Sequence, residues 1–389
     1  MPSWYATNEN PNAGSFFREQ AEALKNAGHN ISILVVHMSN WPYCNINRWF
    51  KIQYYNDNGI WTFHTTVPTF GLSKYSKLFF AIFTAQYKRL FKYYKKKFNA
   101  DIDIIHAHSF WPAGYAAIKI KEKYKIPVVV TEHRSTILTN KIPPSSLPYL
   151  KATVQNSNGF FAVSKNLANT IEKKINIKNY IQIMPNPVAS LFHYEEQTFD
   201  KDVNFLSVGN LVDIKRFDVL IQAFSNAFSE KDNVKLFIVG AGENYNKLEE
   251  LIKYLNLQHK IMLLGPKSRF EVAQLLKKAN IFVLVSKVET FGVAYIEALA
   301  TGRPVIATKN GGANDIITMS NGILIDNDNK VDLIAALRYM KAHFNDYDSK
   351  KISEDCIKKY SAEKWVKHLI KIYTQIQNDK VIKANANNI

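Results

Sequence analysis

The feature of this sequence that most constrains its fold is a regular alternation of short, unbroken apolar runs with longer segments of helical periodicity. Strands that are apolar on both faces belong to parallel sheets, because helices cover both faces of such a sheet. The predicted strands lie at 31–36, 102–108, 126–133, 159–164 and 181–186 in the first half, and at 203–209, 234–240, 261–265, 281–286, 303–308 and 322–326 in the second. Two such sets predict an α/β protein with two doubly wound domains.

The first predicted helix lacks the strand that should precede it. The segment FFREQAEALKNAGH follows a glycine-containing loop, NPNAG at 10–14, as a helix does in a doubly wound domain. No apolar run stands before that loop, since the chain opens with MPSWYAT. We therefore expect the first parallel strand to be mostly missing, either because the start is internal or because the domain does without that strand.

Length and charge narrow the class of protein. A chain of 389 residues exceeds one ordinary core, which again favours two domains. The net charge of +17 is uneven: residues 1–190 hold 23 Lys and Arg against 9 Asp and Glu, whereas residues 191–389 hold 27 against 24. A basic excess attracts phosphates on nucleic acids, lipid headgroups or phosphorylated substrates, so the two halves are expected to face different partners.

The stretch VETFGVAYIEALATGRPVIA at 288–307 joins a predicted strand to a helix through a loop. Ligands of doubly wound sheets bind at the carboxyl ends of strands, and the first backbone N–H groups of a helix hold anions. The amides of Phe291, Gly292 and Val293 lie at this helix start, and Gly292 has no side chain to obstruct a diphosphate. Glu297, about one turn inside the helix, is placed to accept hydrogen bonds from a vicinal diol such as ribose. Glu289 precedes the helix and is placed to reach a sugar beyond the diphosphate.

A second loop carries two positive charges. Lys215 ends the loop that follows the predicted strand at 203–209, with Arg216 beside it. We expect Lys215 to neutralise a diphosphate. The alternative is a pair of solvated charges at a helix start.

The longer pattern around the two glutamates resembles the signature of the retaining glycosyltransferases of family 4. That signature runs E-x-F-G-x-x-x-x-E-A-x-x-x-G-x-P-V, and it is matched by Glu289, Phe291, Gly292, Glu297, Ala298, Gly302, Pro304 and Val305. Other segments resemble the family along nearly the whole chain, among them DIIHAH, VVVTEH, IMPNPV, SVGNLVDIK, GGANDII and YSAEKWVKHLIKIYTQI.

The resemblance implies the GT-B fold, in which two Rossmann-like domains face each other across a cleft and a C-terminal helix crosses back to the first domain. The expected domains are 1–188 for the acceptor, with its first strand truncated, 189–358 for the donor, and 359–389 for the crossover helix.

The resemblance also implies a nucleotide-diphosphate sugar as donor, with roles for particular residues. Glu297 would hold the ribose, Glu289 the donor sugar, and Lys215 with the amides near Gly292 the diphosphate. Gly14 would approach that diphosphate from the first domain. His108 would lie by the reacting sugar, so the expected catalytic residues are Glu289, His108 and Lys215. The chain departs from the family pattern at Asn210, Arg216 and Asp315, and Arg216 is expected to compensate for the arginine replaced by Asn210.

No cofactor or metal ion is expected. The sequence DID at 101–103 opens a predicted strand, and DNDN at 326–329 lacks the glycine and distal glutamate of a calcium loop. We therefore expect metal-independent transfer. The sequence also shows neither a signal peptide at its start nor a run of about 18 apolar residues that would span a membrane, so we expect a cytoplasmic protein.

A basic amphipathic helix is predicted at 74–98, within a stretch that holds no acidic residue between Asp57 and Asp101. Its clustered cations are Lys88, Arg89, Lys92, Lys95, Lys96 and Lys97. Cations beside an aromatic, apolar stripe are typical of a membrane-surface element. The alternative is a stripe packed inside the domain with solvated lysines.

These features predict a glycosyltransferase that extends a saccharide or polyprenyl-diphosphate-linked acceptor for a surface polysaccharide, at the inner face of an anionic membrane. A nucleotide-sugar epimerase or a phosphorylase is the alternative among enzymes. Nucleic-acid binding is disfavoured, because the charge lies in one aromatic-rich helix and no recognition motif is present.

Overall fold

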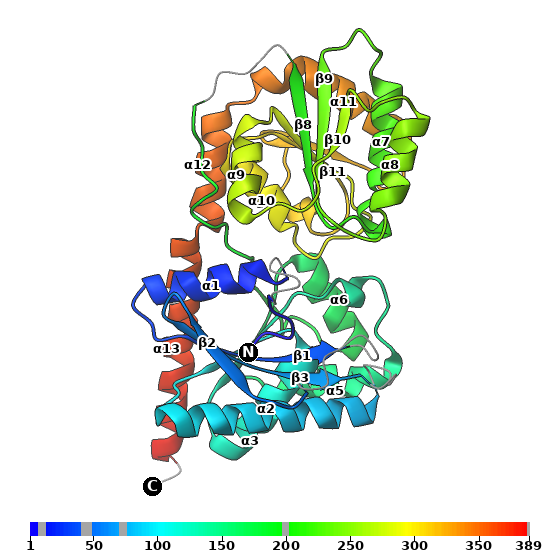
Figure 1. Cartoon of the computed structure of the whole chain (residues 1–389). Helices are drawn as coiled ribbons and strands as arrows, with labels where there is room; N and C mark the ends of the chain where they lie inside the picture. Colours follow the sequence, from blue (N-terminus) through cyan, green and yellow to red (C-terminus); the bar gives the residue numbers. More distant parts are fainter. Residues whose placement is uncertain (7–12, 40–48, 70–75, 197–201, 387–389) are drawn as a thin grey trace. The chain divides into compact units, whose positions relative to one another are not determined.

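The computed structural model describes residues 1–6, 13–39, 49–69, 76–196 and 202–386 (Figure 1). The chain divides into two compact units: unit 1 is Met1–Pro185 with Trp365–Ile389, and unit 2 is Asn186–Lys364. Both units contain parallel β-sheets with helices packed against them, so the predicted α/β class is confirmed. Residues 10–12 of the predicted glycine loop lie outside the described residues.

Unit 2 is built on a six-stranded parallel sheet with the order β10-β9-β8-β11-β12-β13. The strands are β8 (Val203–Val208), β9 (Val234–Val239), β10 (Ile261–Leu263), β11 (Ile281–Leu284), β12 (Val305–Thr308) and β13 (Gly322–Ile325). All residues of β11 and β12 are buried, which explains why they are apolar apart from Thr308, whose hydroxyl donates to the Ser286 carbonyl oxygen at 2.6 Å. All six strands predicted in the second half are present.

Helices cover both sides of this sheet (Figure 1). They are α7 (Phe217–Ala227), α8 (Tyr245–Tyr254), α9 (Arg269–Lys278), α10 (Val293–Ala300), α11 (Lys330–His343) and α12 (Ser349–Tyr360). In Figure 1, α7 and α8 lie on one side and α9 on the other. The strands β8, β11 and β12 are neighbours, so the loops that leave their carboxyl ends meet at one edge of the sheet.

Unit 1 contains two sheets, with the orders β1-β3-β2 and β4-β5-β6-β7. Their strands are β1 (Ser32–Ser39), β2 (Gln53–Asp57), β3 (Ile60–Pro68), β4 (Ile105–His108), β5 (Val128–Glu132), β6 (Gly159–Ala162) and β7 (Gln182–Ile183). The helices are α1 (Ser15–Asn26), α2 (Lys77–Phe98), α3 (Tyr115–Tyr124), α4 (Ser135–Leu138), α5 (Leu147–Asn156), α6 (Lys165–Ile175) and α13 (Ala362–Ala386). In Figure 1, β1 and β3 lie between α1 and α2.

The sequence analysis missed the hairpin formed by β2 and β3. These strands pair antiparallel, so unit 1 is not purely parallel. The turn is Asn58–Gly59, and both residues have positive φ angles, 51° and 85°. Asn-Gly is the strongest short-range signal for a two-residue hairpin turn, so the sequence did contain the information.

Three residues at the start of the chain lie along β4. Pro2 forms a parallel bridge with His108, and Ser3 N donates to the His108 carbonyl oxygen at 3.2 Å. In the part of the chain that the structure describes, β1 pairs with β3 alone and β4 pairs with β5 alone among the strands. Met1–Ser3 therefore lie in parallel beside the end of β4.

The last helix, α13, belongs to unit 1 from Trp365 onward. Its apolar residues Trp365, Val366, Leu369 and Ile376 form one buried cluster with Leu24, Val129, Phe161 and Met184. The unit boundaries fall at 185/186 and 364/365, compared with the predicted domain boundaries at 188/189 and 358/359.

Candidate active site

An ion pair joins two loops at the carboxyl edge of the unit 2 sheet. Lys215 lies in the loop after β8 and Glu289 in the loop after β11, and the Lys215 Nζ atom contacts Glu289 Oε1. Their side chains are 20% and 12% exposed, so the pair is largely shielded from water but remains reachable. The structure thus brings together the two residues predicted for the diphosphate and the donor sugar.

The backbone of the Glu289 loop is held by the loop that follows β12. Glu289 N donates to the Asn310 carbonyl oxygen, and Gly312 N donates to the Glu289 carbonyl oxygen, both at 3.0 Å. A Cβ atom at Gly312 would lie 2.3 Å from the Phe291 carbonyl oxygen, so a side chain at this position would push the two loops apart.

Gly292 is the residue that turns this loop into α10. Its φ angle is +95°, in the left-handed region that glycine adopts without strain, and it caps the helix that begins at Val293. A Cβ atom here would lie 2.3 Å from Tyr295 Cδ2. Tyr295 cannot easily move away, because its hydroxyl donates to the Leu284 carbonyl oxygen at 3.1 Å and accepts from Asn310 Nδ2 at 2.8 Å. The requirement for glycine is therefore both conformational and steric.

Glu297 lies inside α10 and is 2% exposed. Arg269 Nη2, from the first residue of α9, lies 2.7 Å from Glu297 Oε1. A buried carboxylate needs such a partner, because desolvation of an unpaired charge is costly. Arg269 was missed by the sequence analysis. The capping box of Ser268 and Glu271 marks the start of α9, but no local signal shows where the arginine points.

Arg216 is turned toward the loop after β13. Its φ angle of 58° is left-handed, its Nη1 atom donates to Asn327 Oδ1 at 2.9 Å, and its guanidinium pairs with Asp328. The acidic turn predicted at 326–329 therefore binds a cation of the protein itself. A role for Arg216 in holding a phosphate requires that it exchange these partners.

The predicted residues of unit 1 lie close to one another. Gly14 caps α1 with a φ angle of 67°, and a Cβ atom there would lie 2.8 Å from Phe17 Cδ2. The Phe17 ring packs against the ring of His108, with centroids 4.7 Å apart. His108 ends β4, is buried, and its Nδ1 atom lies 3.2 Å from His133 Nε2.

The buried histidines of unit 1 are held neutral. Burial, and then the neighbouring His106 and His133, keep the pKa of His108 well below its ordinary value. Burial lowers the pKa of His133 to about 3. Because a neutral imidazole carries no charge to offer a phosphate, His108 is suited to hydrogen bonding and packing rather than to charge neutralisation.

A buried carboxylate shapes the loop that carries His133. Glu132 is fully buried at the end of β5, and its two oxygens accept hydrogen bonds from backbone N–H groups of Phe110, His133 and Arg134 at 2.7 to 2.8 Å. Three backbone donors satisfy a buried carboxylate without a cation. The sequence analysis did not single out Glu132, although it immediately precedes the histidine.

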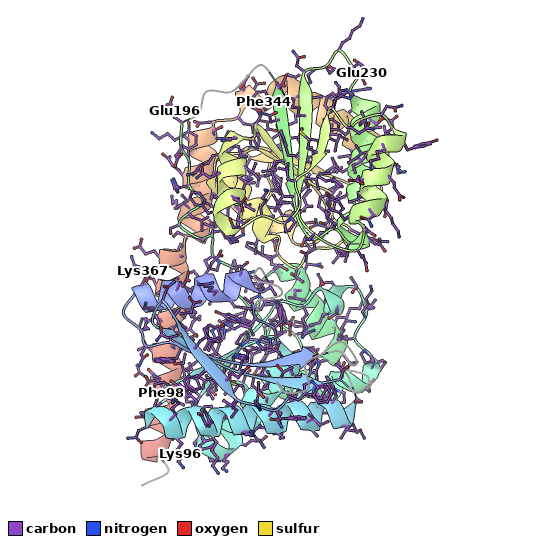
Figure 2. All side chains as sticks on the ribbon, viewed as in Figure 1. Lys96, Phe98, Glu196, Glu230, Phe344 and Lys367 are labelled. Atoms are coloured by element: carbon purple, nitrogen blue, oxygen red, sulfur yellow. The ribbon has the colours of Figure 1, made fainter. Side chains whose placement is uncertain are left out.

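The predicted basic helix is α2, and it buries its apolar face inside unit 1. The buried residues are Phe79, Phe80, Phe83, Thr84, Tyr87, Leu90 and Phe91, whereas the six predicted cations are exposed. Lys96 and Phe98, labelled in Figure 2, lie at the end of this helix. Much of the apolar stripe is therefore committed to the core, while the exposed surface of the helix carries the six cations together with Leu78, Tyr93 and Phe98.

The described helices include none that is long and apolar enough to cross a bilayer. Within the described ranges, no three His, Cys, Asp or Glu side chains come together as the ligands of a metal ion.

Comparison with known proteins identifies the family. Residues 13–190 match the model described as Glycosyltransferase Family 4, and residues 191–358 match the model described as Glycosyl transferases group 1. The chain is 34% identical to the uncharacterized glycosyltransferase MJ1178 of Methanocaldococcus jannaschii over 282 residues, which is 71% of this chain and 76% of that protein. The chain belongs to glycosyltransferase family 4.

Other members of this glycosyltransferase group share lower identity. The N-acetyl-alpha-D-glucosaminyl L-malate synthase of Bacillus anthracis is 26% identical over 56% of this chain and 59% of that protein. Among solved structures, sucrose-phosphate synthase from Thermosynechococcus elongatus superposes with a TM-score of 0.77 at 19% identity, over 95% of this chain and 94% of that chain. The glycosyltransferase therefore has the GT-B fold, and the predicted fold, family and transferase class are confirmed.

Proposed function

We propose that this glycosyltransferase moves a hexosyl group from a nucleoside diphosphate sugar to a saccharide or lipid-linked acceptor, with retention of configuration at the anomeric carbon. The observation that carries the proposal is the ion pair between Lys215, after β8, and Glu289, which lies in the loop that leads through Gly292 into the N-terminus of α10.

The donor diphosphate fits this edge of the sheet. The first amides of α10 have no partner within the helix and point toward its N-terminal side, where an anion is favoured. Lys215 adds a cation that is only partly exposed, so its attraction for a phosphate is weakened less by solvent than that of a surface lysine. Glu289 is then free to accept hydrogen bonds from donor-sugar hydroxyls once Lys215 turns to the phosphate.

The nucleoside ribose fits Glu297. Its carboxylate is buried and already oriented by Arg269, so binding a vicinal diol requires little further ordering of the side chain. Arg269 is itself packed over the Phe192 ring at 4.7 Å, which holds the guanidinium in place. We infer that Arg269 positions Glu297 for the ribose.

The proposed reaction exchanges one glycosidic bond for another. The acceptor hydroxyl oxygen bonds to the anomeric carbon, while the bond from that carbon to the diphosphate oxygen breaks and the nucleoside diphosphate takes the electron pair. The hydroxyl proton passes to the departing phosphate. For this transfer the acceptor must approach the face of the sugar that the phosphate leaves, so the configuration is retained. Lys215 and the α10 amides stabilise the charge of the leaving group, which is a large source of rate acceleration. We propose that they do so without a metal ion.

The named relatives support sugar transfer and leave the acceptor open. One relative is named for transfer to malate and another, from Streptococcus pneumoniae, is an alpha-monoglucosyldiacylglycerol synthase that is 27% identical over 56% of this chain. Acceptors therefore differ widely at this level of identity. A lipid-linked acceptor for a surface polysaccharide is our proposal.

The cationic face of α2 supports a place at an anionic membrane surface on the cytoplasmic side. A shallow hollow of about 530 Å³ lies beside it, and its lining includes Lys51, Arg89, Lys92, Tyr93 and Lys96. Since seven residues of α2, mostly aromatic, are buried in unit 1, we propose attraction by charge rather than insertion of the helix into the lipid.

Calorimetric titration of UDP and GDP against the protein and two variants tests the donor site. Glu297→Gln keeps the shape of the side chain but removes its charge, and we expect at least a tenfold loss of affinity for the preferred nucleotide. Glu250→Gln, at an exposed position of α8, is the matched control and should bind like the unchanged protein. Equal affinities for the two variants, with both folded by circular dichroism, would remove Glu297 from the donor site.

A further inference from the structure

Two histidine rings stack on one another at the end of β4. His106 and His108 lie two residues apart on this strand, so their side chains leave the same face. Their ring centroids are 4.4 Å apart and their planes differ by 23°. The Phe17 ring also packs against His108, with centroids 4.7 Å apart. The plane of the His108 imidazole therefore depends on where the His106 ring is held.

Both ring nitrogens of His106 are engaged with hydroxyl groups. Its Nδ1 atom lies 2.6 Å from the Tyr373 hydroxyl oxygen, and its Nε2 atom lies 2.8 Å from Thr131 Oγ1. Tyr373 comes from α13 and Thr131 from β5, so two separate elements of unit 1 hold the ring. A half-turn of the imidazole would place ring carbons where the two nitrogens lie, and both hydrogen bonds would be lost. The two hydroxyls thus fix the orientation of the His106 ring.

The stronger donor of the two hydroxyls decides which nitrogen of His106 carries the proton. Burial is the main reason why the pKa of His106 lies well below its ordinary value, so the ring is neutral, with one donor and one acceptor nitrogen. A phenol is more acidic than an aliphatic alcohol and donates the stronger hydrogen bond. Tyr373 therefore donates to Nδ1, and the proton of His106 lies on Nε2, which donates to Thr131. Tyr373 sets both the orientation and the tautomer of the ring.

His133 decides the tautomer of His108 by a similar contact. His108 Nδ1 lies 3.2 Å from His133 Nε2, so one of these nitrogens donates to the other. The second nitrogen of His133, Nδ1, is buried and has no hydrogen-bond partner among the described residues. Buried N–H groups lack a partner more rarely than buried acceptors do, so the His133 proton lies on Nε2 and is donated to His108. The proton of His108 then lies on its own Nε2 atom, which makes that atom a donor.

The His106 and Tyr373 rings are held by hydrogen bonds more than by packing. Both line a cavity of about 680 Å³ in unit 1, whose walls include Ile33 of β1 and Ile105 of β4. Both side chains are half-buried, because the described residues leave this side of the pair open. Loss of the Tyr373 hydroxyl would therefore free the His106 ring to turn, since the cavity gives it room.

We propose that Tyr373 is a positioning residue for His108: its hydroxyl orients His106, and the stacked His106 ring holds the His108 imidazole in the plane where its Nε2 atom donates to an oxygen atom of the sugar donor. The inference rests on the proposed function, because it takes His108 to lie by the reacting sugar. Tyr373 acts through His106 and does not touch the substrate. Since a hydrogen bond weakens steeply as it departs from linearity, a tilted imidazole would stabilise the transfer less.

Tyr373→Phe tests the proposal, because it removes the hydroxyl and keeps the ring. Tyr180→Phe, at an exposed position of unit 1, is the matched control. Proton–nitrogen correlation NMR of isotope-labelled histidines separates N–H nitrogens from unprotonated ones, so it reports the tautomers directly. In the unchanged protein and in the control, His106 and His108 should each carry the proton on Nε2. In Tyr373→Phe, His106 should become a mixture of both tautomers, and the His108 signals should move with it.

Kinetics supply the second readout. With UDP-glucose or GDP-mannose, whichever the protein binds, Tyr373→Phe should lower kcat about tenfold and leave KM within about twofold, because the contacts with the substrate remain. A double-mutant cycle with His106→Phe, which keeps a ring without its nitrogens, isolates the route. Tyr373→Phe should lower kcat no further in that background, because its effect passes through His106.

Spectra and kcat equal to those of Tyr180→Phe would overturn the proposal, as would additive effects of Tyr373→Phe and His106→Phe on kcat. His108→Gln separates these outcomes from a failure of the proposed function. If His108→Gln loses transfer while Tyr373→Phe leaves the His106 and His108 signals unchanged, the positioning role alone is wrong. If His108→Gln keeps the rate of the unchanged protein, then His108 does not act on the sugar, and the inference fails together with that part of the proposed function.

Discussion

Replacement of Gly292 by alanine should damage unit 2 through two separable effects. The backbone at Gly292 is left-handed, with φ of +95°, and a residue with a Cβ atom loses about 1–2 kcal/mol in such a conformation. The new Cβ atom would also lie 2.3 Å from Tyr295 Cδ2, and forcing extra atoms into a packed site costs about 1–3 kcal/mol. The expected total is about 2–5 kcal/mol, because hydrogen bonds to Leu284 and Asn310 hold the Tyr295 ring.

Gly265→Ala is the matched control for this prediction. Gly265 also has a positive φ angle, +69°, but no atom lies within 4 Å of its Cβ position. The Gly265→Ala variant should therefore lose only the stability due to backbone conformation, about 1–2 kcal/mol. Urea unfolding followed by tryptophan fluorescence and circular dichroism measures both variants, and Gly292→Ala should shift the midpoint down by about 1–2 M.

The two variants should also differ in function. Relief of the clash moves the start of α10, so Gly292→Ala should lose nucleotide affinity measured by calorimetry, whereas Gly265→Ala should keep it. If both variants lose the same stability and bind alike, then Tyr295 moves aside freely and the steric argument for glycine at this turn is wrong.

Further predictions concern charge. Because the pKa of His133 is lowered to about 3 by burial, the unfolded chain binds the extra proton below pH 6.5, so stability present at pH 7 should be lost as pH falls toward 3. His133→Gln should reduce the fall in the free energy of unfolding between pH 7 and pH 5 by about 2 kcal/mol, as measured by urea unfolding. An unchanged pH dependence would contradict a neutral buried imidazole. Lys215→Met should lower turnover by about 100-fold while Lys247→Met, at an exposed position of α8, stays near the unchanged protein. Transfer should persist in EDTA, and loss that magnesium or manganese restores would refute metal-independent chemistry. A variant with glutamine in place of four exposed lysines should sediment less with phosphatidylglycerol liposomes at low salt but keep its nucleotide affinity. The four lysines are Lys92, Lys95, Lys96 and Lys97.

The sequence by itself determined the fold class and the family. Strands such as β11 and β12 are buried on both faces, so nearly all of their residues are apolar and the run is visible without any knowledge of its neighbours. The signature from Glu289 to Val305 was also visible, because a strand, a glycine turn and a helix start are local features. Both reasons for glycine at position 292 are local, because the turn is at that residue and Tyr295 lies only three residues further along the chain.

The tertiary structure decided which side chains are engaged with one another. Arg269 of α9 reaches Glu297 of α10. Arg216 reaches Asn327 and Asp328 in the loop after β13, more than one hundred residues further along the chain. The same reason explains α2: periodicity showed an apolar stripe, but only packing against unit 1 showed that most of it is buried.

The cavity in unit 1 shows the division most clearly. Only the fold shows that, among the described residues, β1 and β4 each end a sheet and that both line one cavity. Hydrogen-bonding edges and enclosed space arise from segments that lie about seventy residues apart in the chain, so no local pattern in the sequence encodes them.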